Sequence, residues 1–273
     1  MKSKRLIVIL CALAFLTVLI VINSTIFTLQ SVSINWLTTT IQLDSVNEYE
    51  LTSDVTRGGS IFLVNKNKIT AKLEKNNYYL RVVSIETVFP NKLIIHSAER
   101  ESLYAVAMPK MEGSDYRYAI VDEYGKVLDI TSSAIFAQNQ NDGTKPIRVI
   151  FNNIPIKDDD FVLGEIVRVE YIEKLLSMLG VTLREATYTP KTSKGVFNTI
   201  TIGPNGENSV VTMLTRNGMS IVIKDAEEDT TNKFLHGLAA YNKLHQGGVS
   251  SGTIYVQHSQ IDGEISVAYE KAG

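Results

Sequence analysis

Hydrophobic residues are concentrated first in one run near the N-terminus. Leu6 to Ile22 contains no charged residue, and the apolar character continues with few polar interruptions to Leu29. A helix of about 20 apolar residues is long enough to cross the hydrocarbon layer of a bilayer. We therefore expect a transmembrane helix over residues 6–29.

Basic residues lie on only one side of this run. Lys2, Lys4 and Arg5 precede it, and no acidic residue accompanies them. The positive-inside tendency keeps such a flank in the cytoplasm. The pattern predicts a short cytoplasmic tail over residues 1–5 and a single pass, with the rest of the chain outside the cell membrane.

The apolar N-terminal run has two alternatives to a retained anchor: a cleaved signal peptide and a lipoprotein signal. A cleaved signal peptide has a shorter apolar core followed by small residues, which the segment Asn23–Phe27 does not provide. A lipoprotein would use Cys11, but Leu10 stands where a small residue normally precedes the lipidated cysteine. Both features favour the anchor.

The chain then alternates between strand and helix patterns. We interpret residues 30–37 as a juxtamembrane segment in which Trp36 lies at the membrane interface, followed by a β-prone piece from Thr38 to Leu43. Asn65 is a good N-cap for an amphipathic helix over Lys66–Lys75. Next come two β-rich runs joined by a Pro-Asn turn.

The second of these runs closes a first small domain, and a longer segment follows it. The first domain's hairpin is expected over Leu80–Val88 and Leu93–Ala98. The later elements are predicted from turn residues and helical periodicity. They are a hairpin around Glu123–Gly125, a helix over Glu165–Leu179 ending at Gly180, strands Thr199–Ile202, Val210–Thr215 and Ser220–Ile223, a helix over Thr231–His245, and strands Thr253–His258 and Glu264–Tyr269. The predicted fold class is α+β.

Composition narrows the function classes. The 273 residues are 44% hydrophobic, which is enough for one or two compact domains beyond the anchor. A formal net charge of -2 disfavours nucleic-acid binding, which needs a basic footprint. The single cysteine, Cys11, lies in the apolar run, so the outer region has neither a disulfide framework nor a cysteine metal site.

The sequence contains no catalytic motif that we recognise. Asp158–Asp160 lacks the ligand spacing of a calcium loop, and the four histidines show no paired metal-ligand spacing. Nucleophile-elbow and phosphate-loop patterns are absent as well. We expect a protein that is not an enzyme, binds no cofactor and no metal, and acts by binding other proteins.

The order of several short motifs resembles one family. The motifs are Gly59-Ser60-Ile61-Phe62, Phe89-Pro90-Asn91-Lys92-Leu93-Ile94-Ile95, Glu99-Arg100-Glu101 and Tyr118-Ala119-Ile120-Val121-Asp122-Glu123-Tyr124-Gly125-Lys126-Val127-Leu128. Their order behind an apolar N-terminal run resembles the bacterial cell-division proteins FtsQ and DivIB. The chain departs from the family where Ser60 replaces Asn, Lys92 replaces Thr, and no Pro stands near Ser102.

The resemblance implies an architecture and a role. It implies a polypeptide-binding (POTRA) domain of order β-α-α-β-β over residues 38–101 and a mixed α/β unit, called the β domain, over residues 102–273. The family acts as a scaffold at the division septum. Its β domain binds bitopic partners, FtsB/DivIC-like and FtsL-like proteins, with septal peptidoglycan synthase components as further partners, and it controls septal wall synthesis.

The candidate binding residues lie on the last two predicted strands. A sheet without a catalytic pocket offers its edge, where a partner strand can pair with free backbone groups. The resemblance places that surface on the final hairpin, at Tyr255, Val256, Ser266, Val267, Ala268 and Tyr269. The structural alternative for these residues is ordinary core and cross-strand packing, which must hold for those that point inward.

The sequence also allows further contact residues and two alternative functions. In the first domain, Arg81, Phe89 and Pro90 are candidate contacts, although Pro90 is favoured as a turn former. A membrane-tethered cell-wall enzyme and a POTRA-bearing secretion component are the alternative functions. The secretion reading is weak because the chain after the first domain holds helices rather than the many strands of a membrane barrel.

Overall fold

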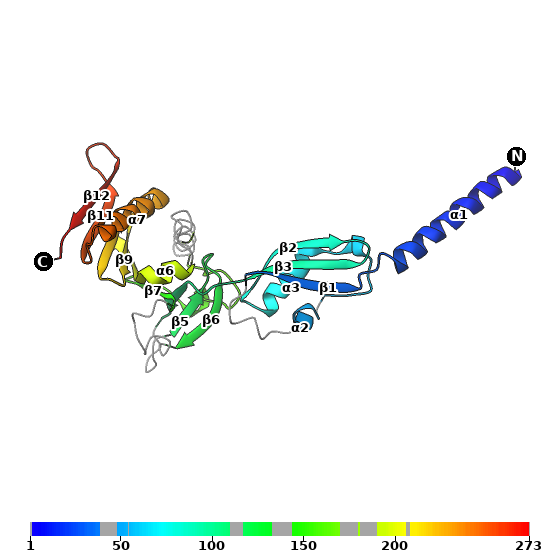
Figure 1. The fold of residues 1–273 in the computed structure, drawn as a ribbon, viewed down its shortest axis with the longest axis horizontal. Coiled ribbons are helices and arrows are strands. Elements are labelled where there is room, and N and C mark those ends of the chain that lie inside the picture. Colours follow the sequence, from blue (N-terminus) through cyan, green and yellow to red (C-terminus); the bar gives the residue numbers. More distant parts are fainter. Residues whose placement is uncertain are drawn as a thin grey trace. The chain divides into compact units, whose positions relative to one another are not determined.

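The computed structural model describes residues 2–38, 48–53, 55–109, 117–132, 144–169, 180, 190–205 and 208–272. The chain divides into two compact units, Met1–Arg100 and Glu101–Gly273. Figure 1 shows the elements of each unit, and each unit is described by itself. The fold is α+β.

The first unit contains a three-stranded mixed sheet with the order β1-β3-β2. Strand β1 pairs in parallel with β3, and β2 pairs antiparallel with β3. Its elements are α1 (Lys2–Thr25), β1 (Ser31–Thr38), α2 (Glu48–Thr52), the 3-10 helix η1 (Ile61–Leu63), α3 (Lys66–Asn76), β2 (Leu80–Val88) and β3 (Lys92–Glu99). The predicted amphipathic helix and hairpin are confirmed as α3 and β2–β3.

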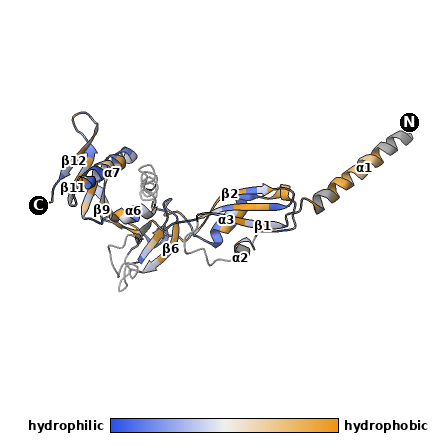
Figure 2. Ribbon diagram, in the orientation of Figure 1, coloured by the Kyte–Doolittle hydropathy of each residue, from blue (hydrophilic) through white to orange (hydrophobic). Residues whose placement is uncertain are grey.

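The first helix, α1, carries the apolar run. Its middle is strongly hydrophobic (Figure 2), and the described side chains from Ile9 to Val21 are exposed around the whole helix. No helix within the described residues meets the length and hydropathy required to cross a membrane.

The segment that we expected to be juxtamembrane is a strand of the first unit. Residues 31–38 form β1, and Val32, Ile34 and Trp36 alternate toward the hydrophobic core. Trp36 therefore packs against the core of the first unit, and the prediction that it lies at a membrane interface is wrong. Alternation of apolar and polar residues is the signal of a half-buried strand. That signal was present here, but Trp36 was interpreted as an interfacial residue instead. The rest of the expected strand over Thr38–Leu43 lies outside the described residues.

An ion pair joins the end of α3 to the end of the sheet. The Glu74 carboxylate accepts a hydrogen bond from the backbone N–H of Val82 at 2.9 Å. Its other oxygen pairs with the Arg100 guanidinium at 2.9 Å, and both side chains are mostly buried. Charge-assisted bonds shielded from water are stronger than exposed ones. Arg100, part of the Glu-Arg motif, thus has a structural role.

The second unit is built on a nine-stranded sheet with the order β12-β11-β10-β9-β8-β7-β4-β5-β6. Parallel pairs join β4 to β7, β7 to β8 and β10 to β11, and the other pairs are antiparallel. Its elements are β4 (Tyr104–Ala107), β5 (Arg117–Val121), β6 (Val127–Ser132), β7 (Ile147–Phe151), the 3-10 helix η2 (Asp158–Asp160), α6 (Pro190–Val196), β8 (Phe197–Asn205), β9 (Asn208–Thr215), β10 (Met219–Lys224), α7 (Thr230–Gln246), β11 (Gly252–His258) and β12 (Ile265–Glu270).

Most predicted elements of this unit are confirmed, but the helix expected from Glu165 does not begin there. Residues 165–169 are not helical: Ile166 forms an isolated bridge with Lys126, and the N–H of Val167 donates to the carbonyl of Gly125 at 3.0 Å. Val167 is fully buried, whereas Ile166, predicted to face the core, is 47% exposed. Apolar residues at short spacing fit a strand as well as a helix, and here pairing with the β5–β6 turn decides. Residues 170–179 lie outside the described residues.

We predict that Ile34→Ala destabilises the first unit by about 2–3 kcal/mol, because it leaves a cavity under β1. The exposed neighbour Asn35 provides the control: Asn35→Ala should cost about 0.5 kcal/mol or less. Urea unfolding of the full chain, followed by the fluorescence of its single tryptophan, Trp36, measures this unit selectively. Equal midpoints for the two variants would mean that β1 is not part of the core.

Candidate partner-binding edge

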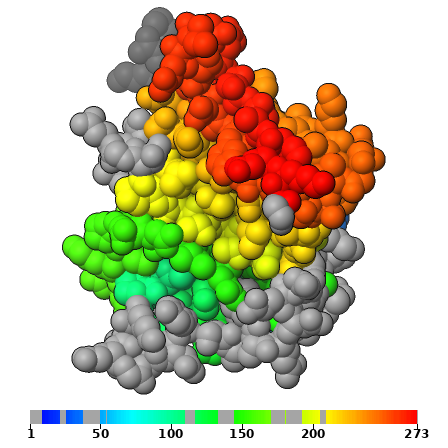
Figure 3. Space-filling view, turned by 90° about the vertical axis from the view of Figure 1, so that its left-hand side faces the viewer, coloured from blue at the N-terminus to red at the C-terminus, as the bar shows by residue number. Residues whose placement is uncertain are grey.

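Strand β12 ends the nine-stranded sheet and pairs only with β11. The described backbone bonds outside the ladders include none to residues 265–270. An edge strand presents unpaired N–H and C=O groups at alternate positions along its free side. In Figure 3 the last strands, in red, lie on the surface beside α7, in orange.

Helix α7 determines where this edge lies. It connects β10 to β11, which run parallel, and packs on the face of both strands. Phe234 and Leu238 are buried against the sheet. A Cβ on Gly237 would lie 2.9 Å from Ile221 Cγ2 and 3.3 Å from Val256 Cγ2, so the helix approaches too closely for a larger residue.

A buried lysine fastens the start of α7. Lys233 Nζ donates to the carbonyls of Lys224 at 3.1 Å and Asp225 at 2.7 Å. Burial lowers the pKa of Lys233, while the carboxylates of Asp225 and Glu228 act in the opposite direction. The side chain therefore satisfies the carbonyls of the last residue of β10 and of the residue after it, and it fixes the start of α7 to the end of that strand.

The register divides the predicted binding residues between two faces. Val256 pairs with Val267 and Tyr255 pairs with Ala268, and paired residues share a face of the sheet. Val256 is fully buried under α7, so it is a core residue and is not available to a partner. Tyr255 is half-buried on the opposite face, so the six residues divide between the two faces, as expected for those that point inward.

The edge strand itself is open. Ser266 and Ala268 are exposed, and Val267 is 39% exposed although it points to the α7 side. Natural edge strands usually carry lysine, proline or a bulge that prevents pairing with another chain. The sequence Ile-Ser-Val-Ala-Tyr-Glu of β12 has none of these, and its register with β11 is unbroken. The strand is suited to accept a further strand.

Tyr269 has a structural task in addition to its place on the edge. Its hydroxyl donates to the carbonyl of Ser251 at 2.8 Å. Its ring lies where a Cβ on Gly252 would be, 2.6 Å from Cε2, and Gly252 has a φ of +129° that favours glycine. Tyr269 therefore holds the end of β12 to the start of β11.

Two features of this region were missed by the sequence reasoning. Thr212, Val222, Tyr255 and Ala268 form one row across β9 to β12 on the face opposite α7, and their alternation with core residues was the available signal. Ile261, at the tip between the last two strands, is 97% exposed. Both extend the surface that a partner on β12 would meet.

The comparison with protein families identifies the first unit. Residues 27–100 match the family model described as POTRA domain, FtsQ-type. Residues 27–100 of the first unit form a POTRA domain of the FtsQ type. The match is consistent with the resemblance to FtsQ and DivIB. A search of curated proteins finds no match for the chain.

The match also corrects the start of the domain. It begins at residue 27, so the POTRA domain includes β1 and the segment 30–37 that we expected to lie outside it. Of its predicted contact residues, Phe89 is 58% exposed and Pro90 is exposed at the β2–β3 turn. Arg81 is half-buried on β2 opposite Ala98. Arg81 lies near the start of β2 and the other two residues follow its end, so the three residues do not form one surface.

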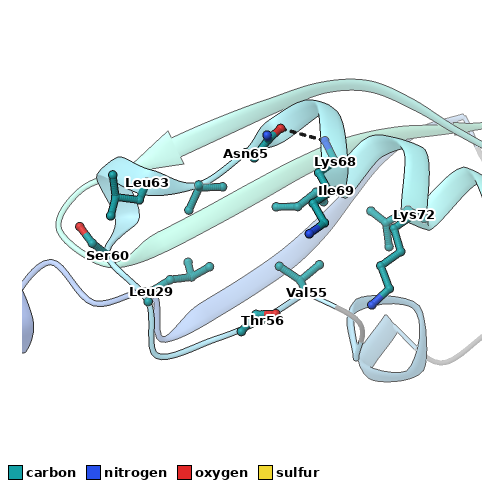
Figure 4. Close-up of a pocket in the computed structure, with 12 residues that line it drawn as sticks. Leu29, Val55, Thr56, Ser60, Leu63, Asn65, Lys68, Ile69 and Lys72 are labelled. Atoms are coloured by element: carbon teal, nitrogen blue, oxygen red, sulfur yellow. Dashed lines mark hydrogen bonds between the residues drawn. The ribbon is translucent and has the colours of Figure 1, made fainter.

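The POTRA domain contains a cavity of about 370 Å³ between α3 and the chain that precedes it. Figure 4 shows Leu29, Val55 and Ile69 around it, with Lys68 and Lys72 extending from α3. Asn65 Oδ1 caps α3 by accepting from the N–H of Lys68 at 3.0 Å. The described residues of its lining include no acid, histidine or cysteine, so they supply no acid–base pair.

The polar groups considered for metal binding have local partners instead. Asp158 pairs with Arg117 at 2.6 Å, and Asp160 accepts from the N–H of Lys157 at 2.7 Å. His258 contacts the carbonyl oxygen of Gly263 at 2.8 Å. Among the residues that the structure describes, no group of acids, histidines or cysteines could hold a metal ion.

We predict that Gly237→Val destabilises the second unit by about 1–3 kcal/mol, because the added methyl groups collide with Ile221 and Val256. Ala239→Val, at an exposed position of the same helix, is the matched control and should cost about 0.5 kcal/mol. Hydrogen exchange of the β10 and β11 amides in the full chain measures the local opening free energy. Equal protection in the two variants would contradict the close packing of α7.

Proposed function

We propose that this chain is a non-enzymatic scaffold of the cell-division machinery that binds partner ectodomains through the free edge of β12. The single observation that carries the proposal is the unprotected edge strand of the second unit. It stands in a chain whose first unit is an FtsQ-type POTRA domain. A partner segment adds to the sheet as a further strand, and backbone hydrogen bonds supply its affinity.

The side chains of the edge supply selectivity. Alternate residues of an added strand meet different faces, one formed by Val267 and Tyr269 and the other by Ser266 and Ala268. No lysine or arginine lies within β12, and Glu270 ends it. A partner strand with small or apolar residues, flanked by a basic residue near Glu270, complements this surface.

The partners that fit the proposal are bitopic division proteins. We propose FtsB/DivIC-like and FtsL-like proteins as the strand donors, and septal peptidoglycan synthase components as further contacts. Holding these ectodomains together lets the scaffold determine when septal wall synthesis begins. It needs no catalytic group of its own.

The proposed location is the bacterial cell membrane at the division septum. Residues 6–25 of α1 form the single-pass anchor, with the N-terminus in the cytoplasm and with the POTRA domain and the second unit outside. The anchor ends before the expected residue 29, because Leu29 is buried in the POTRA core. Lys2, Lys4 and Arg5 support this orientation. The apolar side chains exposed around α1 support a lipid environment, since a helix that is hydrophobic on all sides needs an apolar surrounding.

The first prediction of this proposal concerns the edge. Val267→Glu places a charge on the free strand and should weaken capture of a DivIC-like partner by tenfold or more, about 1.4 kcal/mol. Val83→Glu is the matched control, because Val83 is 50% exposed on β2 of the POTRA domain. Co-purification of the partner with the full chain in detergent is the measurement.

Two further results complete this test. Tyr255→Lys, on the other face, reports whether the partner also covers the row across β9 to β12. Hydrogen exchange of β11 in each variant verifies that the sheet is intact. Capture by Val267→Glu at the level of the unchanged chain would move the binding surface away from β12.

The second prediction concerns location. A fluorescent protein fused to the cytoplasmic N-terminus should be enriched at midcell in dividing cells. The fusion leaves both units unchanged, so its distribution reports the whole chain. A uniform membrane signal throughout the cell cycle would contradict the division role.

A further inference from the structure

Three phenylalanine rings and the neighbouring residue Leu63 expose apolar surface at one end of the POTRA domain, and Leu63 also lines the cavity beside α3. Phe62 is 59%, Leu63 84% and Phe89 58% exposed, while Phe27 is half-buried between the other rings. The ring centroids lie 5.2 Å apart for Phe27–Phe62, 5.4 Å for Phe62–Phe89 and 6.3 Å for Phe27–Phe89. We call Phe27, Phe62, Leu63 and Phe89 the aromatic patch.

Backbone hydrogen bonds hold the three segments that carry the patch. The N–H of Ile61 donates to the carbonyl of Phe27 at 2.8 Å, and the N–H of Leu29 donates to the carbonyl of Gly59 at 2.8 Å. The N–H of Gln30 donates to the carbonyl of Asn91 at 2.9 Å. The rings therefore stand on a fixed base rather than on independent loops.

The same base separates inward from outward residues. Leu29 and Ile61 are buried at 1% and 3% exposure and join the domain to its core. Their neighbours Phe62 and Leu63 point outward instead, although burial of such side chains is worth about 1.5–3 kcal/mol each. A contiguous exposed apolar surface of this kind marks an interaction site.

The charges around the patch favour a lipid surface as its occupant. The segments 26–30, 57–65 and 87–92 contain no acidic residue. Lys92 follows the turn that carries Phe89, whereas the Arg57 guanidinium is engaged with Thr52. Basic residues beside exposed rings suit the anionic headgroup layer, where apolar side chains reach the boundary with the acyl chains. A protein partner that bound mainly through charge would need more charged residues in the patch than these segments provide.

Chain continuity supports the same occupant. Helix α1 ends at Thr25, and Phe27 is the second residue after it. Two residues span at most about 7 Å, which places Phe27 at the end of α1 whatever the orientation of the domain. If α1 is the membrane anchor, as the proposed function holds, the first residue of the patch cannot leave the interfacial layer.

We propose that the aromatic patch inserts into the interfacial layer of the bilayer that holds α1. Leu63 and the rings of Phe62 and Phe89 enter beside Phe27, and the POTRA domain thereby has a fixed orientation on the membrane. The inference rests on the proposed anchor. It adds that the domain is bound to the lipid surface by its own residues as well as tethered to it.

The test uses the full chain in liposomes of anionic lipid and an environment-sensitive fluorophore on one cysteine. The native Cys11 reports on α1, because the chain has no other cysteine. Cys11→Ala with Leu63→Cys reports on the patch, and Cys11→Ala with Val83→Cys is the matched control on the exposed side of β2. Lipids brominated near the headgroup quench fluorophores at that depth, and lipids brominated along the acyl chains quench a fluorophore at Cys11 inside the apolar run.

We expect quenching at position 63 at least about twofold stronger than at position 83, as for a residue in the headgroup boundary. Quenching at Cys11 without quenching at position 63 would overturn the inference and leave the anchor standing. Absence of quenching at both positions would overturn the anchor and the inference together. A fluorescence shift at position 63 that follows protein density without lipid quenching would assign the patch to protein contacts and overturn the inference.

Discussion

The packing of α7 against β10 and β11 fixes where the large sheet ends, and with it the surface that we propose for partners. The helix carries the chain from the end of β10 back to the start of a parallel strand, which a short turn could not do. Gly237 lets it approach the sheet, and Lys233 ties its first turn to the carbonyls that follow β10. Strand β11, buried on the helix side, then supports β12 with a register that has no break.

The two edges of this sheet differ in how far other parts of the chain cover them. At one end the segment around Ile166 bonds to Gly125 at the end of the β5–β6 turn and to Val127 at the start of β6, so chain of the same unit covers part of that edge. At the other end the described residues place nothing beside β12. Unpaired backbone groups on an exposed strand favour pairing with another chain unless charge or shape prevents it. The sequence of β12 carries no charge from Ile265 to Tyr269, and only Glu270 at its end is charged.

The POTRA domain presents a different kind of unsatisfied surface. Its core is closed around Leu73, Leu80 and Leu93, and the Glu74–Arg100 pair joins helix to sheet. The aromatic patch is nevertheless exposed, on segments that hydrogen-bond to one another. A free strand edge attracts a peptide backbone, whereas an apolar patch with nearby basic residues attracts a lipid surface. Under the proposed function, the edge of β12 holds partners and the aromatic patch holds the POTRA domain on the membrane.

Sequence by itself determined the elements whose signal is local. Asn65 as N-cap, the turn at Pro90, the α7 periodicity and the last two strands all follow from short-range chemistry, and they place the candidate residues on the final hairpin. Tertiary pairing decided the rest. Residues 31–38 form a strand because β3 is available beside them, and residues 165–167 leave the helical path because they bond to Gly125 and Val127. Which of Tyr255 and Val256 faces a partner depends on the side that α7 covers, and the patch joins residues far apart in the chain. Such choices depend on contacts between distant segments, which no local pattern encodes.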